Sequence, residues 1–209
     1  MTDSTTARRG RGRRPAAEVR ANVLEATGRL LLEEGIQAIT FDRVAKEAGS
    51  SKMTLYKWWP TPGALVAEAY FSRSQPVLEF PDTGDIRTDL ITQLRSFVHW
   101  LTGAGRTVTE LIGAAQLDPE LARAWAHHYA TPRRELARAR LATARDQGQL
   151  TPEADLHIIV DQLWGACYHR LLVLMVPLDD TIVERLVDQA LYGAANPSGG
   201  TPGGSTEIG

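Results

Sequence analysis

The stretch that decides the fold is ITFDRVAKEAGSSKMTLYKWW, residues 39–59. Its first half predicts a short amphipathic helix, because its apolar residues recur at the spacing i, i+3, i+4, i+7: Phe41, Val44, Ala45 and Ala48. Thr40 stands where a side chain caps a helix start, and Gly49 stands where a left-handed residue ends one.

The second half predicts another short helix. Ser50 or Ser51 caps it, it runs to about Trp58, and Leu55 and Trp59 share its inward face at i, i+4. Two such helices joined by residues 48–51 have the dimensions of a helix-turn-helix, whose second helix lies in the major groove of DNA.

If Leu55 and Trp59 face inward, four polar or flexible side chains face outward. They are Lys52, Met53, Tyr56 and Lys57. Cations, a phenol and a thioether suit phosphates, base edges and thymine methyl groups. The pattern alone leaves open an ordinary helical hairpin with a solvated basic face.

The rest of the chain is also helix-periodic, with no convincing alternating strand and no internal repeat. A first helix is expected from about Ala16 to Glu34, ended by Gly35, and a fourth from about Gly63 to Gln75. Further helices are expected at about 86–102, 106–116, 118–129, 132–147, 153–175 and 180–193, with breaks at glycines and prolines. We therefore expect an all-α chain.

The run 39–59 resembles the tetracycline-repressor (TetR/AcrR-like) family. The shared features are Thr40, then Val44-Ala45, Ala48-Gly49, Thr54-Leu55-Tyr56 and the aromatic pair Trp58-Trp59. The resemblance extends over residues 16–70, and the remainder is similar only in being helical. It implies a homodimeric repressor that places two recognition helices in successive major grooves of a palindromic operator in double-stranded DNA.

The resemblance also implies roles for individual residues. Thr40 would be the backbone-anchoring cap, Arg43 would approach a phosphate or base edge, and Trp58 would pack against the sugar-phosphate wall. Bases or phosphates would be met by Lys52, Met53 and Thr54, and phosphate by Tyr56 and Lys57. One position departs from the family pattern: Pro62 stands where a lysine usually opens the fourth helix, followed by Gly63 where an acid is common.

The charge distribution fits a polyanion-facing N-terminus. The formal net charge is −2, but residues 1–60 carry +4 and residues 61–209 carry −6. Residues 1–15 are expected to be a disordered basic arm that adds phosphate or minor-groove contacts, through Arg8, Arg9, Arg11, Arg13 and Arg14. A merely solubilising tail is the alternative.

We divide the chain into the arm (1–15), a helix-turn-helix DNA-binding domain (16–61), a helical-bundle ligand-binding and dimerisation domain (62–195) and a disordered tail (196–209). The helices at 153–175 and 180–193 carry more apolar surface than one core-facing stripe needs, which favours a four-helix dimer interface. The expected interface residues are Leu156, Ile159, Val160, Leu163, Ile182, Val183, Leu186 and Val187. A fully buried central helix of a monomer is the alternative.

The second domain also carries an aromatic set that favours a pocket for a small apolar or amphipathic effector. The candidates are Phe71, Phe97, Trp100, Leu101, Leu111, Trp125, His128, Tyr129, Trp164 and Tyr168. For each of them, core packing is the alternative. In a second functional hypothesis, the helix-turn-helix still binds DNA, but this domain serves only dimerisation or the binding of protein partners. It then has no small-molecule effector.

No chemistry of an enzyme is visible in the sequence. The histidines and Cys167 lack metal-site spacing, and there is no nucleophile elbow or phosphate loop, so we expect no cofactor, no metal and no catalysis. A single cysteine suits a reducing cytoplasm, and no run approaches the ~18 apolar residues of a membrane span. We therefore expect a cytoplasmic protein with no membrane partner.

Overall fold

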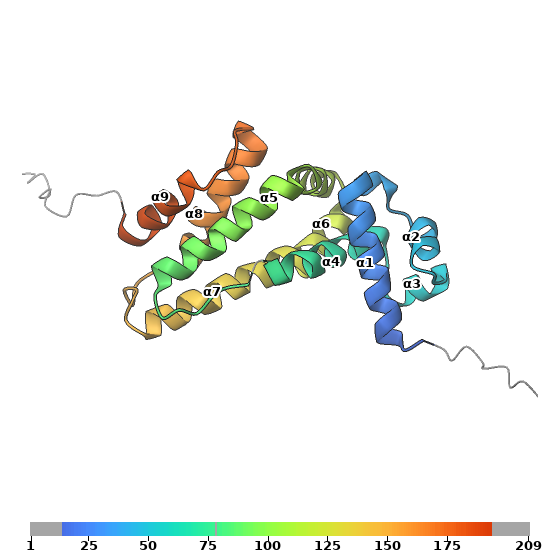
Figure 1. Cartoon of the computed structure of the whole chain (residues 1–209), viewed down its shortest axis with the longest axis horizontal. Helices are drawn as coiled ribbons and strands as arrows, with labels where there is room; N and C mark the ends of the chain where they lie inside the picture. Colours follow the sequence, from blue (N-terminus) through green and yellow to red (C-terminus); the bar gives the residue numbers. More distant parts are fainter. Residues whose placement is uncertain (1–13, 78, 194–209) are drawn as a thin grey trace, which may run out of the picture. The chain divides into compact units, whose positions relative to one another are not determined.

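The computed structural model describes residues 14–77 and 79–193 and shows helices and turns, with no strand in those ranges, which confirms the all-α prediction (Figure 1). The helices are α1 (Ala16–Glu34), α2 (Phe41–Glu47), α3 (Lys52–Trp58), α4 (Pro62–Ser74), α5 (Ile86–Leu117), α6 (Pro119–Trp125), α7 (Thr131–Asp146), α8 (Leu156–His169) and α9 (Thr181–Tyr192). The tail and four of the five arm arginines, Arg8, Arg9, Arg11 and Arg13, lie outside the described residues.

The chain forms two compact units. The first contains α1 to α4, the part of α5 from Arg106 onward, α6 and the π-helical turn Ala126–Ala130. The second contains the part of α5 up to Gly105, then α7, α8, the π-helical turn Arg170–Leu174 and α9. Each unit has its own buried residues.

In the first unit, α1 packs against α4 and against α2, and α2 packs against α3 (Figure 1). The apolar period of α1 predicted this core, because Val23, Leu30 and Leu31 are almost fully buried. They meet the buried stripe of α4, which includes Leu65 and Tyr70. Burial of these large side chains holds the helices in place.

The predicted break between residues 102 and 106 is wrong, because α5 is one continuous helix of 32 residues. Gly103 and Gly105 lie inside it. A glycine inside a helix costs only about 1 kcal/mol relative to alanine. The apolar stripe that continues through Leu101, Ala104 and Val108, all buried, is enough to outweigh that cost.

Two more predicted helices end earlier than expected. The helix placed at 118–129 is α6 followed by a π-helical turn, and the turn ends just before Thr131-Pro132, where the proline has no N–H to donate. The helix placed at 153–175 begins at Leu156, where Asp155 caps it, and gives way to a π-helical turn at Arg170.

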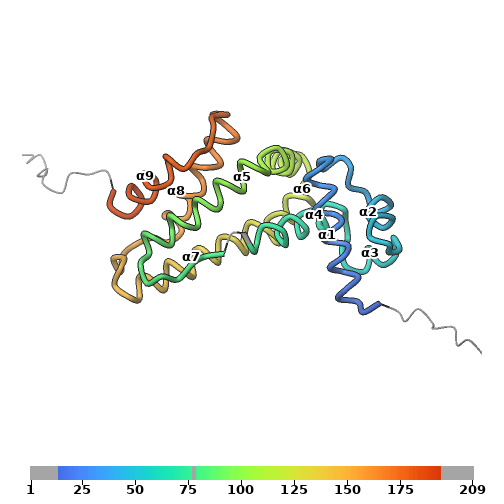
Figure 2. Tube along the Cα trace, in the orientation of Figure 1, coloured from blue at the N-terminus to red at the C-terminus, as the bar shows by residue number. Residues whose placement is uncertain are grey.

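In the second unit, α8 packs against α7 on one side and α9 on the other (Figure 2). Ion pairs join these helices at their edges: Arg134 of α7 binds Asp161 of α8, and Arg87 of α5 binds Asp188 of α9 with Nε 2.7 Å from Oδ1. The unit is therefore held by packing between consecutive helices and by ion pairs that join α5 to the distant α9.

The predicted dimer-interface residues differ in their burial within one chain, and the interface itself stays a prediction. Leu163, Val183 and Val187 have no exposed surface. They fill the seam between neighbouring helices of one chain. Ile182 and Leu186 are partly exposed, whereas Leu156, Ile159 and Val160 keep at most 8% of their surface.

Candidate DNA-binding site

The helix-turn-helix is fixed by side-chain caps at the start of both short helices. Thr40 Oγ1 accepts a hydrogen bond from the Arg43 N–H at 3.2 Å, and Ser51 Oγ accepts one from the Thr54 N–H at 3.1 Å. Gly49 between them has φ of +59°, the left-handed conformation expected for the turn. The predicted caps are confirmed, and Ser51 is the one of the two serines that caps α3.

The inward face of α3 is anchored by Leu55 and Trp59, which are 0% and 1% exposed. The indole N–H of Trp59 donates to Glu68 Oε2 at 2.7 Å, and Arg20 of α1 forms an ion pair with the other oxygen of Glu68. The guanidinium of Arg20 also lies 5.3 Å from the centre of the Trp59 ring. These contacts join the end of α3 to α1 and α4, and sequence reasoning missed both Arg20 and Glu68.

The outward face of α3 carries the side chains predicted to read DNA. Met53 is 72% exposed and Tyr56 is 51% exposed, with the Tyr56 ring edge-on to Phe41 at 4.7 Å between centroids. Lys57 is exposed and has no ion-pair partner among the described residues. Trp58 is half-buried. The centre of its ring lies 5.5 Å from that of the Trp59 ring, and the two ring planes are 77° apart.

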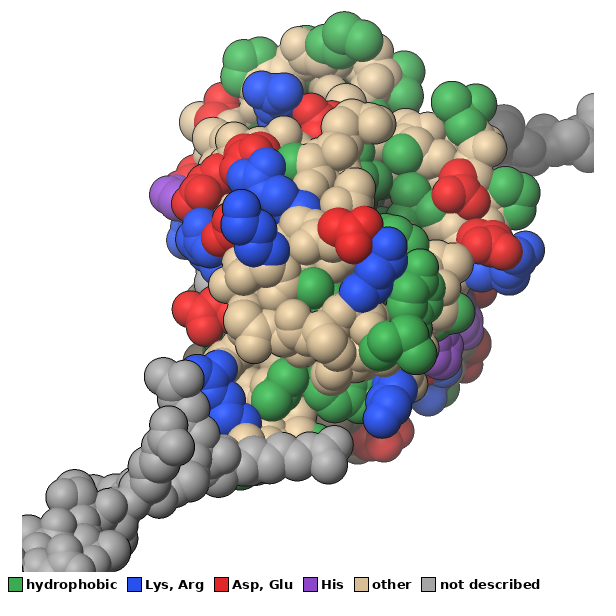
Figure 3. All heavy atoms as spheres, turned by 90° about the vertical axis from the view of Figure 1, so that its right-hand side faces the viewer, with side chains coloured by type: hydrophobic (Ala, Val, Ile, Leu, Met, Phe, Trp, Pro, Cys, Tyr) green, Lys and Arg blue, Asp and Glu red, His purple; other side chains and the backbone are tan. Residues whose placement is uncertain are grey.

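Two of the predicted DNA-binding cations are paired with carboxylates of the same unit. Lys52 Nζ lies 2.8 Å from Asp42 Oδ2, and this hydrogen bond raises the pKa of Lys52. Arg43 binds Glu34 at 2.8 Å and approaches Glu47 at 3.9 Å. Accordingly, Figure 3 shows basic and acidic side chains next to one another over the face that lies on the right of Figure 1.

The loop before α2 is held by a residue far along the chain. Gly35 has φ of +84°, and a Cβ on it would lie 2.6 Å from Glu110 Oε2 of α5. The same oxygen accepts a hydrogen bond from the Ile36 N–H at 3.2 Å, while Arg106 Nε donates to the other oxygen at 2.9 Å. The bond from Arg106 is the main reason why the pKa of Glu110 is lowered.

The fourth helix, α4, follows the helix-turn-helix after a short connection. Thr61 Oγ1 accepts a hydrogen bond from the Ala64 N–H at 3.2 Å, and Pro62 occupies the first turn, where a missing N–H is tolerated. Further along α4, the Tyr70 ring lies 5.3 Å from the Trp125 ring and 4.9 Å from the Tyr129 ring. An aromatic cluster therefore joins α4 to α6 and the π-helical turn that follows.

The ten predicted pocket residues do not all fall in one unit. Five lie in the first unit: Phe71, Leu111, Trp125, His128 and Tyr129. Five lie in the second: Phe97, Trp100, Leu101, Trp164 and Tyr168. His128 lines a cavity of about 310 Å³ together with Thr61 and Arg123, and burial lowers its pKa. Leu101 and Leu111 have no exposed surface and serve as core residues.

A capped helix-turn-helix with an apolar inner face and an exposed, partly basic outer face defines the protein as a helix-turn-helix DNA-binding regulator. Residues 23–69 match the model of bacterial regulatory proteins of the tetR family, and residues 80–190 match that of the tetracyclin repressor-like C-terminal domain. The chain belongs to the tetR family. It is a DNA-binding transcriptional regulator and not an enzyme, and the regulators of this family act as dimers.

Relatives cover most of the chain. The HTH-type transcriptional regulator YdeS of Bacillus subtilis (strain 168) is 35% identical over 82% of this chain and 87% of its own length. The DNA-binding transcriptional repressor TetR of Mycobacteroides abscessus is 31% identical over 85% of this chain and 94% of its own length. The crystal structure of the TetR family transcription regulator SCO0332 is 53% identical, covers 86% of this chain and all of that one, and superposes with a TM-score of 0.80.

One structural finding concerns membranes. Within residues 14–77 and 79–193, no helix is both long enough and apolar enough to cross one.

Proposed function

We propose that the protein is a dimeric repressor that binds a palindromic operator and leaves it when a small apolar or amphipathic ligand binds. The observation that carries this proposal is the division of α3 into two faces, with Leu55 and Trp59 buried and Met53 and Tyr56 exposed. Such a helix presents side chains to a groove while its inner face keeps it in position. The relative from Mycobacteroides abscessus is itself named a repressor.

In this proposal, the DNA contacts come mainly from the exposed face of α3. Met53 and Thr54 meet base edges, and Lys57 binds phosphate without giving up a carboxylate partner. Lys52 and Arg43 must exchange their carboxylate partners for phosphate or base atoms. The single described arginine of the arm, Arg14, is exposed one residue before Pro15 and α1, where it adds a further cation.

Dimerisation in this proposal uses the outward faces of α8 and α9. Ile158 on α8 is 51% exposed and Tyr192 on α9 is 70% exposed, and the half-buried Ile182 and Leu186 lie on the same α9. Large apolar side chains left in water on two neighbouring helices suit a self-complementary interface. A two-fold dimer places its recognition helices one DNA turn apart, about 34–36 Å.

Release follows from the position of α4. Three residues separate this helix from α3. The ring of its Tyr70 lies against the rings of Trp125 and Tyr129, which follow α5, and is edge-on to Tyr129. A ligand bound in the C-terminal domain that favours a conformer with these aromatics displaced shifts α4, and with it the spacing of the two recognition helices of the dimer. A ligand with equal affinity for both conformers releases nothing.

The experiment that tests the proposal is selection of bound fragments from genomic DNA with the full-length protein. We expect enriched fragments that share an inverted repeat with half-sites one or more helical turns apart. Enrichment of single, asymmetric sites would refute the dimeric reading, and enrichment no greater than for bulk DNA would refute sequence-specific binding.

A further inference from the structure

One side chain in the second unit is buried without any hydrogen bond. Gln93 of α5 has no exposed surface, and neither its Oε1 nor its Nε2 has a partner among the described residues. Buried amide atoms are normally hydrogen-bonded, because an unsatisfied one costs the free energy of removing it from water. Both polar atoms of the Gln93 amide are therefore open to a hydrogen-bonding partner.

The neighbours of Gln93 on α5 show where its side chain lies. One turn earlier, Asp89 binds Arg140 of α7, and one turn later the Phe97 ring lies 5.5 Å from the ring of Tyr168 of α8. Residues four apart share a helix face. Gln93 is thus directed into the interior that α5 shares with α7 and α8, between a polar layer and an aromatic layer.

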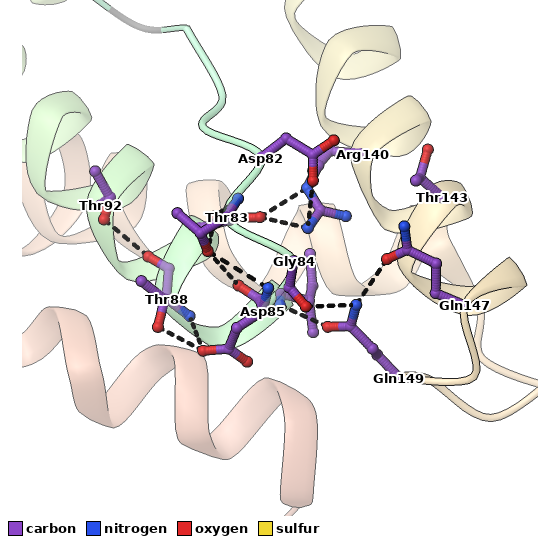
Figure 4. Close-up of polar contacts among 12 residues, drawn as sticks. Asp82, Thr83, Gly84, Asp85, Thr88, Thr92, Arg140, Thr143, Gln147 and Gln149 are labelled. Carbon is purple, nitrogen blue, oxygen red and sulfur yellow. Dashed lines mark hydrogen bonds and ion pairs between the residues drawn. The ribbon is translucent and has the colours of Figure 1, made fainter.

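The polar layer is already neutralised. Arg140 Nε lies 2.8 Å from Asp89 Oδ2, and the other oxygen of Asp89 accepts hydrogen bonds from the Thr83 N–H at 3.0 Å and the Thr83 hydroxyl at 2.7 Å. Figure 4 shows Asp82 and Thr83 next to Arg140, and Asp82 Oδ1 lies 3.4 Å from its Nη2. Arg140 Nη1 is likewise buried without a partner among the residues described.

We propose that Gln93 is the polar anchor of a ligand site inside the second unit, and that this site takes an uncharged ring compound bearing a carboxamide or lactam. The proposal rests on the ligand response proposed above and names the class of ligand. An amide pairs reciprocally with the Gln93 amide, since each donates one N–H and accepts at one oxygen. The aromatic layer at Phe97 and Tyr168 receives the ring.

At the polar layer, charge favours a neutral matching group over a carboxylate. Arg140 already lies against both Asp82 and Asp89, so a further anion there would add an uncompensated negative charge. The two acceptor oxygens of a carboxylate would also leave Gln93 Oε1 without a donor. Three probes of similar size separate these chemistries: benzamide, benzoate and toluene.

The experiment titrates each probe into the full-length protein and follows the protein's NMR shifts. The variants are Gln93→Met, which keeps the length of the side chain, and the control Gln116→Met, an exposed glutamine on the same helix. We expect the native protein and the control to bind benzamide more tightly than toluene or benzoate. Gln93→Met should bind benzamide at least about tenfold more weakly, because both hydrogen bonds of the amide pair are lost, and toluene at least as well as before.

A second measurement does not depend on the probes. Removing an unsatisfied amide stabilises the free protein, so Gln93→Met should raise its unfolding temperature by about 2–4 °C, while Gln116→Met leaves it unchanged. A lower unfolding temperature, failure to fold, or unchanged benzamide affinity in Gln93→Met overturns the proposal, as does a native preference for benzoate or the absence of benzamide binding. Benzamide binding through Gln93 without a change in operator affinity would support the Gln93 ligand site. It would refute the proposal that ligands of this class release the protein from its operator.

Discussion

Lys52 at the start of the recognition helix lies 2.8 Å from Asp42 of the preceding helix, Nζ to Oδ2. In the free protein the Asp42 carboxylate forms an ion pair with Lys52, as Glu34 does with Arg43. In the proposed complex, DNA exchanges a carboxylate partner for a phosphate one, so the net gain per cation is smaller than for a free lysine such as Lys57. We therefore expect the pairing to weaken non-specific binding.

Replacing Asp42 with asparagine should strengthen binding to random duplex DNA, by about two- to fivefold, because Lys52 loses its internal competitor. The dependence of affinity on salt should steepen by up to ~0.9 in log–log slope if one phosphate contact is gained. Fluorescence anisotropy at several salt concentrations measures both. Glu153→Gln, which removes the same charge from an exposed site in the second unit, should change neither, and weaker binding by Asp42→Asn would contradict the exchange.

Glu68 holds the Trp59 indole and Arg20 at once, and its side chain is only 14% exposed. Glu68→Ala should lower the free energy of unfolding by about 1–3 kcal/mol, because it leaves a buried N–H without an acceptor. Glu68→Gln keeps an acceptor for the indole and should lose less. Urea unfolding measures the series, with Glu25→Ala on exposed α1 surface as control. Equal losses in the two Glu68 variants would show that the indole hydrogen bond contributes nothing.

The lowered pKa of Glu110 makes its contribution to stability dependent on pH. A carboxylate whose folded pKa lies below the unfolded value, about 4.3, stabilises fully above that value and loses its contribution as the pH falls through the folded pKa. The stability difference between the native protein and Glu110→Gln should be constant from pH 6 to 8 and shrink in acid. Urea titrations from pH 3 to 8 test this, and a difference that grows in acid would reverse the sign that we assign.

Local interactions explain what the sequence predicts well. The bounds of α1, the caps at Thr40 and Ser51 and the left-handed Gly49 depend on residues within one or two turns of each other, and the structure has all of them as expected. The inward positions of Leu55 and Trp59 follow from helical spacing in the same way.

Contacts between residues that are distant in the sequence could not be predicted from such local patterns. Glu68 and Glu110 act on partners 48 and 74 residues earlier in the chain, and nothing in their surroundings distinguishes them from solvated acids. The glycines of α5 predicted a break because their local cost is visible in the sequence, whereas the packing that outweighs it is not. No signal in the sequence distinguishes Gln93 from a solvated glutamine, and only its burial in the fold does so.

The proposed dimer surface can be tested with a single charge. Ile158→Asp places a carboxylate on the outward face of α8 and should shift the protein from dimer to monomer in sedimentation velocity, because an unpaired charge cannot be buried cheaply. Leu136→Asp makes the same change at a similarly exposed residue of α7 and should leave a dimer. If Ile158→Asp also remains dimeric, the interface lies elsewhere.

The central claim is that the outward face of α3 reads DNA, and its most direct test is the affinity of the Lys52→Ala/Tyr56→Ala double variant for an operator obtained by genomic selection. With folding verified by circular dichroism and Arg145→Ala as a control cation from the second unit, fluorescence anisotropy gives each affinity. We predict a loss of about tenfold for the double variant, less than two full contacts would give because Asp42 already pairs with Lys52, and little change for the control. Full operator affinity in the folded double variant would contradict the assignment of α3 as the recognition helix.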